Sequence, residues 1–447
     1  MPDGESSGSE LTRRRLLRNA GVAGAGAAAA GLLGAPAMAD DSTSAEADRH
    51  GQSRPRIGEL VWLAGDHHLH TRYSPDGLYR VEDHVKHASA YGLDWVVVND
   101  HGGPQHARFG AALANVDIRA ARAAYRDMLV FQGLEWNMPG AEHGTVFVHP
   151  GPDEVAVLTE FENAYDGIVR GATASTAANE ALAIAGLDFL ADAVGRQRVA
   201  DALVLANHPA RRGIDSPHEL RGWRDAQPRI AVGMEGAPGH QPAGIKVPSG
   251  PGLARGAYAL PPSPDSFPGY PIESYRTFGG FDWMTATVGG LWDSMLAEGV
   301  PWWITASSDS HFAHADSAVR GPNSNFLGNG FYNEPVYGTP ADLSYFDFWP
   351  GYYSRTQVGA THFSYAAVMA GIRAGRVWVD QGGLIAGLDV RAGLAGGPGS
   401  ATLGDTLRVP AGASAELTIA IDVATRPNWA QFVPALARVD IIGGEVT

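Results

Sequence analysis

The sequence predicts an α/β protein with a barrel-like core of parallel strands and a small β-rich module at its C-terminal end. Between residues 60 and 384, short apolar runs alternate with helical patterns, as in parallel sheets whose strands are joined by helices. Most of these apolar runs end in His, Asp or Glu. From residue 385 onwards the helical patterns stop and only strand-like runs remain.

Composition narrows the possible classes of function. The formal net charge of the 447 residues is −15, which disfavours a nucleic-acid scaffold because phosphate backbones are bound by clustered lysine and arginine. The sequence contains no cysteine, so disulfides, thiolate metal ligands and a cysteine nucleophile are excluded. Any metal must be held by His, Asp and Glu, and bound ions would let an acidic chain bind an anionic substrate.

Residues 1–39 resemble a twin-arginine signal peptide. The basic stretch 12–18 (TRRRLLR) precedes a weakly apolar Ala/Gly run, and Ala37-Met38-Ala39 fits a small-x-small cleavage site. The alternative, a membrane anchor, is disfavoured because the run is short and rich in glycine. We therefore expect a periplasmic or extracellular protein with no stable membrane insertion after cleavage. Residues 40–59 are polar and lack periodicity, as in a disordered linker.

The expected elements follow from periodicity and from helix and turn signals. The expected barrel segment is 60–384, with strands at 61–64, 94–99, 129–132, 145–148, 202–206, 229–234, 301–306 and 376–380 and helices at 81–91, 118–126, 173–196, 283–298 and 362–374. The expected β-sandwich-like module, 385–447, has strands at 388–391, 415–423 and 437–442. The irregular segment 313–360 is expected to wall the pocket or to pack outside the barrel, and 236–280 is a second long irregular stretch.

Polar side chains follow most of the expected barrel strands. Carboxyl ends of parallel strands meet at one mouth of a barrel, where such folds place their chemistry. The side chains expected there are His68, His70, Asp76, His101, Glu135, His208, Asp309 and His311, with either His143 or His149 nearby. Imidazoles and carboxylates of this kind suit zinc, manganese or iron. The segment therefore predicts a site for several divalent metal ions.

Six motifs occur in a fixed order: DHHLH, SPDG, NDHGG, GLEWN, NHP and SDSH. Together they resemble the PHP (polymerase and histidinol phosphatase) family, over roughly residues 60–380, and within it most resemble secreted metallohydrolases. The resemblance implies a distorted, TIM-like seven-stranded (β/α) barrel with two or three metal ions. The implied ligands are His68, His70 and Asp309 for the first metal, Glu135 as a bridge, His208 with a further His for the second, and Asp76, His101 and His311 for the third.

The resemblance also bears on the uncertain ligand and on catalysis. Family members often open the corresponding strand with a Gly-His pair, which favours His143 over His149, although Glu142 stands here in place of glycine. The residues expected at the catalytic centre are Glu135, Asp309 and His101.

Metal-bound water with a pKa lowered towards ~7 would supply hydroxide as the nucleophile. We expect a secreted metal-dependent hydrolase, a phosphoesterase acting on a small anionic ester. A carboxylic or carbamic ester hydrolase on the same centre and a non-catalytic metal-containing binding protein are the alternatives. The sequence leaves the substrate, the metal and the oligomeric state open.

Arginines near the motifs are candidates for binding the substrate. Arg211 and Arg212 follow His208 closely, and Arg72 lies inside the first motif. Each could hold a phosphate in bidentate fashion or belong to a solvated loop. Glu235 ends a strand and could support the metal ligands from behind, although a surface or structural carboxylate is the favoured interpretation. His84 is expected to be exposed on a helix.

Overall fold

The computed structural model describes residues 56–57, 59–240, 258, 260–275, 277–278, 280–312, 318–338, 347–397, 399–428 and 431–446. All of them belong to the unit Glu46–Thr447. The expected signal peptide and most of the expected linker lie outside the described residues. None of the helices described is long and apolar enough to cross a membrane.

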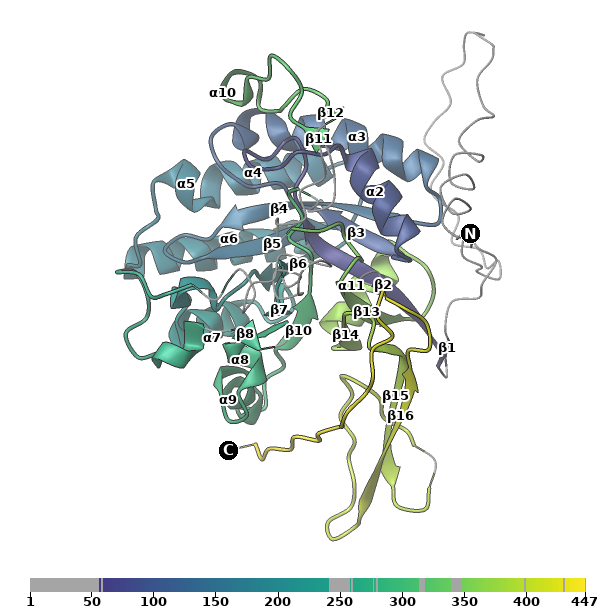
Figure 1. Ribbon diagram of the computed structural model, residues 1–447. Helices are drawn as coiled ribbons and strands as arrows, with labels where there is room; N and C mark the ends of the chain where they lie inside the picture. The colour runs from purple at the N-terminus through teal and green to yellow at the C-terminus, as the bar shows by residue number, and fades with distance from the viewer. Residues whose placement is uncertain are drawn as a thin grey trace, which may run out of the picture. The chain divides into compact units, whose positions relative to one another are not determined.

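The elements, labelled as in Figure 1, have the following bounds. The main sheet contains β1 (Arg56–Ile57), β2 (Leu60–Leu69), β3 (Trp95–Val98), β4 (Leu129–Asn137), β5 (His143–Val148), β6 (Ala202–Ala206), β7 (Ala231–Ala237), β10 (Trp303–Ala306), β13 (Ser354–Ala360) and β14 (Val377–Gln381). Three smaller sheets pair β8 (Thr277–Phe278) with β9 (Phe281–Asp282), β11 (Ala318–Val319) with β12 (Val336–Tyr337), and β15 (Ile385–Leu394) with β16 (Ala415–Val423). The helices are α2 (Val81–Ala90), α3 (Ala111–Ala124), α4 (Glu154–Tyr165), α5 (Gly167–Arg170), α6 (Ala177–Gly195), α7 (Pro217–Ala226), α8 (Trp283–Ala286), α9 (Leu291–Ala297), α10 (Phe326–Asn329) and α11 (Tyr365–Arg373), with short helical turns η1 (His106–Gly110), η2 (Arg211–Gly213) and η4 (Ile272–Tyr275).

Seven strands follow one another in chain order around a barrel: β2, β3, β4, β5, β6, β7 and β10. Neighbouring strands are parallel except β5, which runs antiparallel to both β4 and β6. The chain after β10 meets the end of β2, where His70 N donates to Ser310 O at 2.8 Å. The antiparallel pair β13 and β14 extends the sheet from β2. The predicted distorted seven-stranded α/β barrel is confirmed.

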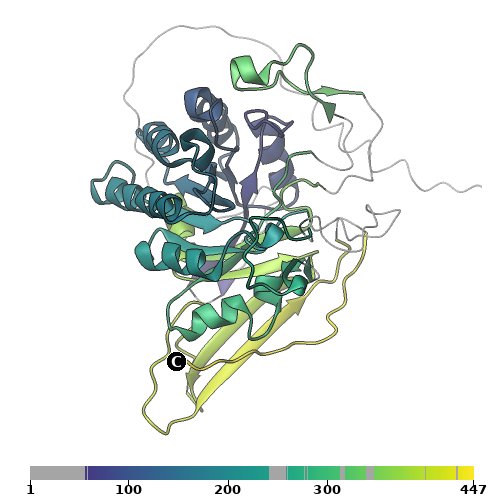
Figure 2. The same ribbon diagram turned by 90° about the vertical axis from the view of Figure 1, so that its left-hand side faces the viewer.

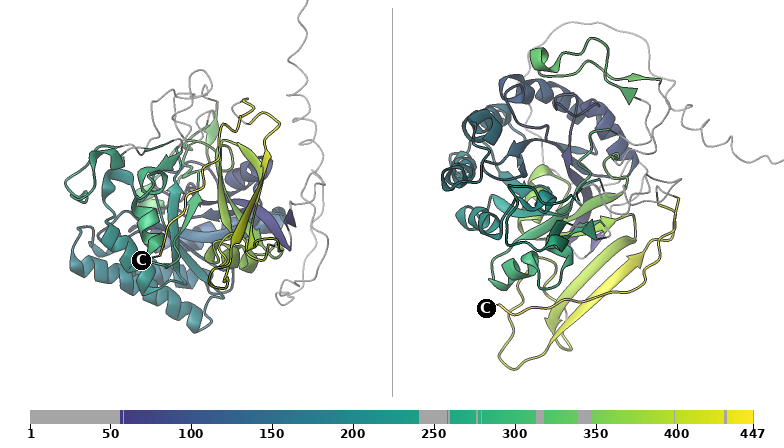
Figure 3. Two further views of the ribbon diagram at one scale, coloured as in Figure 1. Left: turned by 90° about the horizontal axis from the view of Figure 1, so that it is seen from below. Right: turned by 60° about the vertical axis from the view of Figure 1, so that its left-hand side comes forward.

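Alternating apolar side chains fill one end of this barrel. Val61 and Leu63 of β2 and Val97 of β3 point into one core, to which the other strands add Phe131 and similar residues and α11 adds Val368. These residues lie towards the starts of the parallel strands, so α11 closes that end with apolar contacts. Helices α2 to α7 cover the outer face of the sheet (Figures 2 and 3). The opposite end, where the parallel strands finish, is left for polar side chains.

Local signals explain where the outer helices begin. Helix α7 starts with a capping box, because the side chain of Ser216 accepts from Glu219 N and the side chain of Glu219 accepts from Ser216 N. Pro217 occupies the first turn, where its missing N–H costs nothing. The side chain of Thr176 caps α6 in the same way by accepting from Asn179 N.

Several expected boundaries were wrong. β2 and β4 run beyond the apolar runs, to Leu69 and Asn137, because their polar residues face the mouth while their backbones remain paired. The helix expected at 283–298 is divided into α8 and α9 by a turn in which Gly290 N donates to Thr287 O at 2.8 Å and Gly289 has a φ of +75°. Helices α4 and α7 and strand β13 were not expected. The strand expected at 437–442 does not form, and the described part of the C-terminal module is the β15–β16 hairpin.

Candidate metal centre

The nine predicted metal ligands converge at the polar end of the barrel. They come from the ends of β2, β3, β6 and β10, from the loop after β2, from within β4 and from the start of β5. Their side chains form overlapping groups that could each hold an ion: His70-Asp76-His101-His311, His68-His70-Asp309, His68-Glu135-His208 and His101-Glu135-His143. The structure thus brings every residue of the predicted set into one site.

The direction of β5 explains why His143, and not His149, lies in this site. Because β5 is antiparallel to its neighbours, its first residue lies beside the ends of β4 and β6. His149 follows the other end of β5, where its backbone N donates to Asp201 O at 2.8 Å and its ring lies 6.0 Å from the ring of Tyr365. The geometry therefore leaves His143 as the candidate ligand.

Glu135 is the centre of the cluster. Both of its oxygens lie close to imidazole nitrogens, and its side chain is buried. Oε1 is 3.0 Å from His68 Nε2, 3.0 Å from His143 Nδ1 and 3.3 Å from His208 Nε2, and Oε2 is 2.7 Å from His101 Nδ1 and 3.3 Å from His70 Nε2. Burial alone would raise the pKa of Glu135, but the charges of His101, His143 and His68 hold it well below its usual range. A carboxylate that contacts five imidazoles has the geometry of a bridging ligand.

Asp309 completes the group around His68 and His70. Its Oδ1 lies 3.0 Å from His68 Nε2 and 3.1 Å from His70 Nε2. The Tyr258 hydroxyl donates to the other oxygen, Oδ2. Asp309 has a φ of 49°, a left-handed conformation that is uncommon outside glycine and often found at functional sites.

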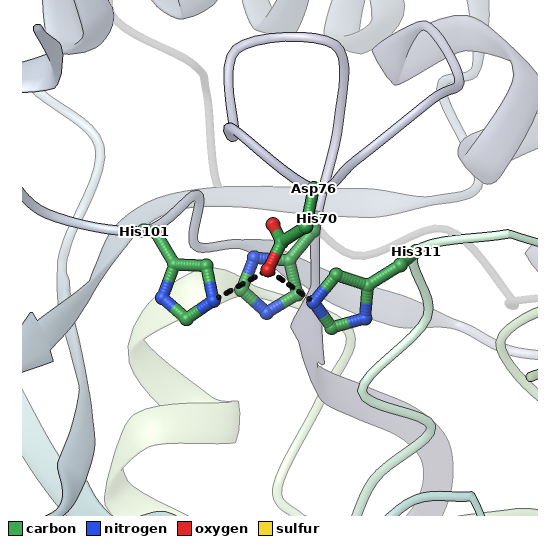
Figure 4. A group of neighbouring side chains, drawn as sticks. All are labelled: His70, Asp76, His101 and His311. Atoms are coloured by element: carbon green, nitrogen blue, oxygen red, sulfur yellow. Dashed lines mark ion pairs between the residues drawn. The ribbon is translucent and has the colours of Figure 1, made fainter.

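Asp76 and three imidazoles form the group on the outer side of the site (Figure 4). Asp76 Oδ2 is 3.1 Å from His101 Nε2 and 3.4 Å from His311 Nε2. The rings of His70 and His311 stack with centroids 4.0 Å apart. His70 therefore lies between the Asp309 group and the Asp76 group.

The outward-facing nitrogens of the first two histidines are already engaged. His68 Nδ1 is 2.7 Å from Glu235 Oε1, and His70 Nδ1 is 3.1 Å from Ser74 Oγ. These contacts turn both Nε2 atoms into the cluster, where they are 3.0 Å apart. A carboxylate behind a histidine is a common arrangement at metal sites, since it fixes the tautomer and the ring orientation.

The donor set fits divalent cations. One oxygen of Glu135, Oε2, is buried and makes no hydrogen bond of acceptable geometry within the described part of the chain, although His101 Nδ1 is 2.7 Å away. Facing imidazole nitrogens and a carboxylate oxygen of this kind offer lone pairs to a common point, as in zinc, manganese and iron sites.

For Glu235 the structure favours the alternative of a residue that supports the ligands over the surface or structural carboxylate that was favoured from the sequence. Glu235 is fully buried at the end of β7, and its second oxygen accepts from His208 N at 2.7 Å. It therefore contacts two of the predicted ligands from behind. His84 was wrongly expected to be exposed: it is buried, and its Nε2 lies 2.8 Å from His70 O.

A pocket of about 530 Å³ opens onto the cluster. Besides predicted ligands, its wall contains Arg211, His240, Tyr258, Leu260, Phe312 and Asp347. Of the three arginines expected to bind substrate, Arg211 lines this pocket. Arg212 is exposed to solvent, and Arg72 instead contacts Asp117, with Nη2 3.3 Å from Oδ2. The structure does not place Arg72 and Arg212 on the pocket wall.

Three wall residues had no readable signal in the sequence. His240, Tyr258 and Asp347 come from the two irregular stretches, in which no strand or helix pattern indicates direction. His240 Nε2 is 2.8 Å from the backbone oxygen of Asp309, and Asp347 Oδ2 accepts from His311 N at 2.6 Å. These contacts hold the segment that carries the last two predicted ligands.

Comparison with known proteins finds a family model that covers part of this site. Residues 66–199 match the model of the PHP domain. This stretch of the chain is similar to the PHP domain. The matched residues include six of the nine predicted ligands: His68, His70, Asp76, His101, Glu135 and His143. No curated protein matches the chain.

Solved structures with a similar course of the chain share little sequence with it. A two-domain protein from Bacteroides vulgatus containing a predicted PHP-like metal-dependent phosphoesterase is 13% identical, with a TM-score of 0.35 over 76% of this chain and 69% of that one. PsfC from Pseudomonas syringae is 13% identical, with a TM-score of 0.33 over 71% and 91%. An amidohydrolase from Chromobacterium violaceum is 16% identical, with a TM-score of 0.22 over 38% and 76%.

The PHP match and the convergent His, Asp and Glu side chains together support a metal-dependent hydrolase. The cluster suits divalent ions without selecting one metal among zinc, manganese and iron.

Proposed function

We propose that this protein is a metal-dependent phosphoesterase that hydrolyses a small anionic ester. The observation that carries the proposal is the convergence of six imidazoles and three carboxylates at the floor of a pocket whose wall contains Arg211. The site consists of imidazoles and carboxylates and the chain has no cysteine, which is consistent with hydrolysis that needs no Ser or Cys nucleophile.

The residues that would hold the ions are those predicted from the sequence. Glu135 would bridge two ions, one with His68, His70 and Asp309 and one with His143 and His208, and a third would lie among Asp76, His101 and His311. Divalent ions bound there would supply Lewis-acid polarisation of the ester and activation of water.

Residues of the chain itself would bind the ester, orient the metal ligands and exclude water. Arg211 would bind a phosphate oxygen through its guanidinium, a charge-assisted contact that also orients the ester. Glu235 and Ser74 would keep the imidazoles of His68 and His70 aimed at the centre. Leu260 would exclude water from one side of the bound ester.

Metal analysis and a substrate panel test the proposal. The protein is loaded separately with zinc, manganese and iron, its bound metal is measured, and turnover is followed on phosphomonoesters, phosphodiesters and aryl carboxylic and carbamic esters. Turnover of phosphoesters is expected, and Asp309→Asn should lower both bound metal and turnover. A fully loaded protein that hydrolyses carboxylic or carbamic esters but no phosphoester would contradict the proposal, and a loaded protein without any turnover would favour a binding role.

We also propose that the protein is exported by the twin-arginine route, on the strength of the basic stretch at residues 12–18. Replacing Arg13 and Arg14 by lysine should leave the full-length protein in the cytoplasm, as measured by fractionation. Unchanged export of that variant would contradict this route.

A further inference from the structure

Arg211, the arginine on the pocket wall, is paired with a carboxylate. Its Nη1 lies 3.3 Å from Glu142 Oε2, and Glu142 is almost fully buried whereas Arg211 is partly exposed to the pocket. The backbone of Glu142 is fixed at both polar atoms: its N donates to Asp215 Oδ1 at 2.9 Å and its O accepts from Met138 N at 3.2 Å. The negative charge behind Arg211 is therefore held in place by the fold.

The same carboxylate lies beside a predicted metal ligand. Glu142 Oε2 is 3.8 Å from His208 Nδ1, which is buried and makes no hydrogen bond among the described residues. His208 Nε2 faces Glu135 on the other side. Glu142 thus adds one negative charge next to both the pocket's arginine and the ligand cluster, without lining the pocket itself.

This charge affects how many negative charges a bound ester can carry. Among the described residues on the pocket wall, Arg211 is the only lysine or arginine. A phosphomonoester carries close to two negative charges at neutral pH, since its second pKa is about 6, whereas a phosphodiester carries one. Partly buried charges are weakly screened, so Glu142 opposes the second charge of a monoester more than the single charge of a diester.

The rest of the wall offers space for a second organic group. Tyr258, Leu260 and Phe312 line the pocket, and the Tyr258 ring packs 5.1 Å from the ring of His208. These surfaces lie in the same pocket as the predicted ligands. A diester has two organic groups to bury, and an apolar wall favours burying them.

We infer that Glu142 tunes this pocket for singly charged phosphodiesters over doubly charged phosphomonoesters, as a positioning residue that acts through Arg211. The inference rests on the proposed phosphoesterase function and narrows its substrate class.

Two substrates with one leaving group test the inference on the wild-type protein. Methyl 4-nitrophenyl phosphate is a monoanion and 4-nitrophenyl phosphate a dianion at about pH 8. We expect kcat/KM to be at least about tenfold higher for the diester, because the carboxylate of Glu142 repels the second negative charge of the monoester at short range. A preference for the monoester would overturn the inference while leaving the phosphoesterase proposal intact. Absence of turnover of both, with full metal content, would instead overturn the proposed function.

Replacing the carboxylate should change the preference and not merely the activity. Glu142→Gln is expected to lower the ratio of diester to monoester kcat/KM by about tenfold, through a lower KM for the monoester. Glu160→Gln is the matched control, since Glu160 forms an exposed pair with Arg198 at 2.7 Å far from the pocket, and it should leave the ratio unchanged. Adding Arg211→Gln to Glu142→Gln should abolish the gain for the monoester. An unchanged ratio in Glu142→Gln, or a gain that persists without Arg211, would overturn the inference.

Binding provides a second readout that does not depend on turnover. Calorimetry compares phenylphosphonate, a dianion, with its monomethyl ester, a monoanion, on the metal-loaded wild-type protein. Tighter binding of the monomethyl ester supports the inference, and tighter binding of the dianion refutes it. This comparison decides the matter even where Glu142→Gln fails to fold or to retain metal.

Discussion

The buried carboxylate of Glu235 should control metal affinity although it is not a predicted ligand. Its oxygens accept from three donors: Oε1 from His68 Nδ1 at 2.7 Å and from Ser307 Oγ at 2.7 Å, and Oε2 from His208 N at 2.7 Å. Glu235→Gln keeps the shape but replaces one acceptor oxygen by an NH₂ group. One side must then lose its acceptor, either the His208 N–H or the pair formed by His68 and Ser307.

The magnitude follows from what those contacts do. Loss of a carboxylate behind a metal-binding imidazole lowers metal affinity by about 10–100-fold, or about 1.4–2.8 kcal/mol. A buried donor left without an acceptor costs a further ~1–3 kcal/mol of folding free energy. We therefore expect Glu235→Gln to bind metal at least about tenfold more weakly and to unfold at a lower temperature.

Competition with a chelating dye measures the affinity, and a thermal melt measures the stability. The matched control is Glu154→Gln, which removes a buried carboxylate remote from the site that pairs with Arg122 at 2.8 Å. That variant should lose stability without losing metal affinity. If both variants bind metal as tightly as the wild type, or if both weaken it equally, the reasoning about Glu235 is refuted.

Three further predictions concern the ligand choice, the pH dependence of stability and the barrel interior. His143→Ala should lower the bound metal content and His149→Ala should not, and equal losses on elemental analysis would contradict the geometry. Burial raises the pKa of Asp282 to about 8. The folded protein therefore keeps a proton that the unfolded chain loses above about pH 4, so this group lowers stability by ~1.4 kcal/mol per pH unit between those values. Asp282→Asn should remove that slope, so the melting temperature of the variant should rise relative to that of the wild type as the pH increases from 5 to about 8. Parallel curves of melting temperature against pH for the two proteins would contradict the assignment. Gly65→Ala should destabilise the fold by more than ~3 kcal/mol, because the new Cβ would lie 2.0 Å from the Trp95 indole, and an unchanged denaturation midpoint would show that the packing there is looser.

Much of the barrel and of its site could be predicted because two patterns coincide in the sequence. Runs such as 95–98 and 202–206 are apolar on both faces, which marks buried parallel strands. Polar residues that follow such runs reach one mouth because the carboxyl ends of parallel strands lie together. This reasoning also applied to Glu235 at the end of β7, but a single carboxylate there gave no reason to choose burial over exposure.

These patterns could predict neither the direction of a strand nor the position of residues in irregular segments. Nothing in the run 145–148 distinguishes an antiparallel strand from a parallel one, because side-chain alternation is the same in both. Segments that lack periodicity place their residues through tertiary contacts alone. His240 and Asp347 therefore reach the pocket through hydrogen bonds to the chain around Asp309, which no local signal predicts.

The reversed strand β5 connects the barrel's distortion to its chemistry. In a barrel with only parallel strands, residues that precede a strand lie at the end remote from the active site. Here a short hairpin joins β4 to β5, so the residues just before and at the start of β5 return to the mouth. Glu142 and His143 occupy those two positions, one beside Arg211 and the other 3.0 Å from Glu135. The reversal thus places two neighbouring residues at the mouth: His143 faces the predicted metal ligands, and Glu142 adds a negative charge beside Arg211. A change at position 142 can then alter the preferred substrate charge while the strand pairing that positions His143 stays the same.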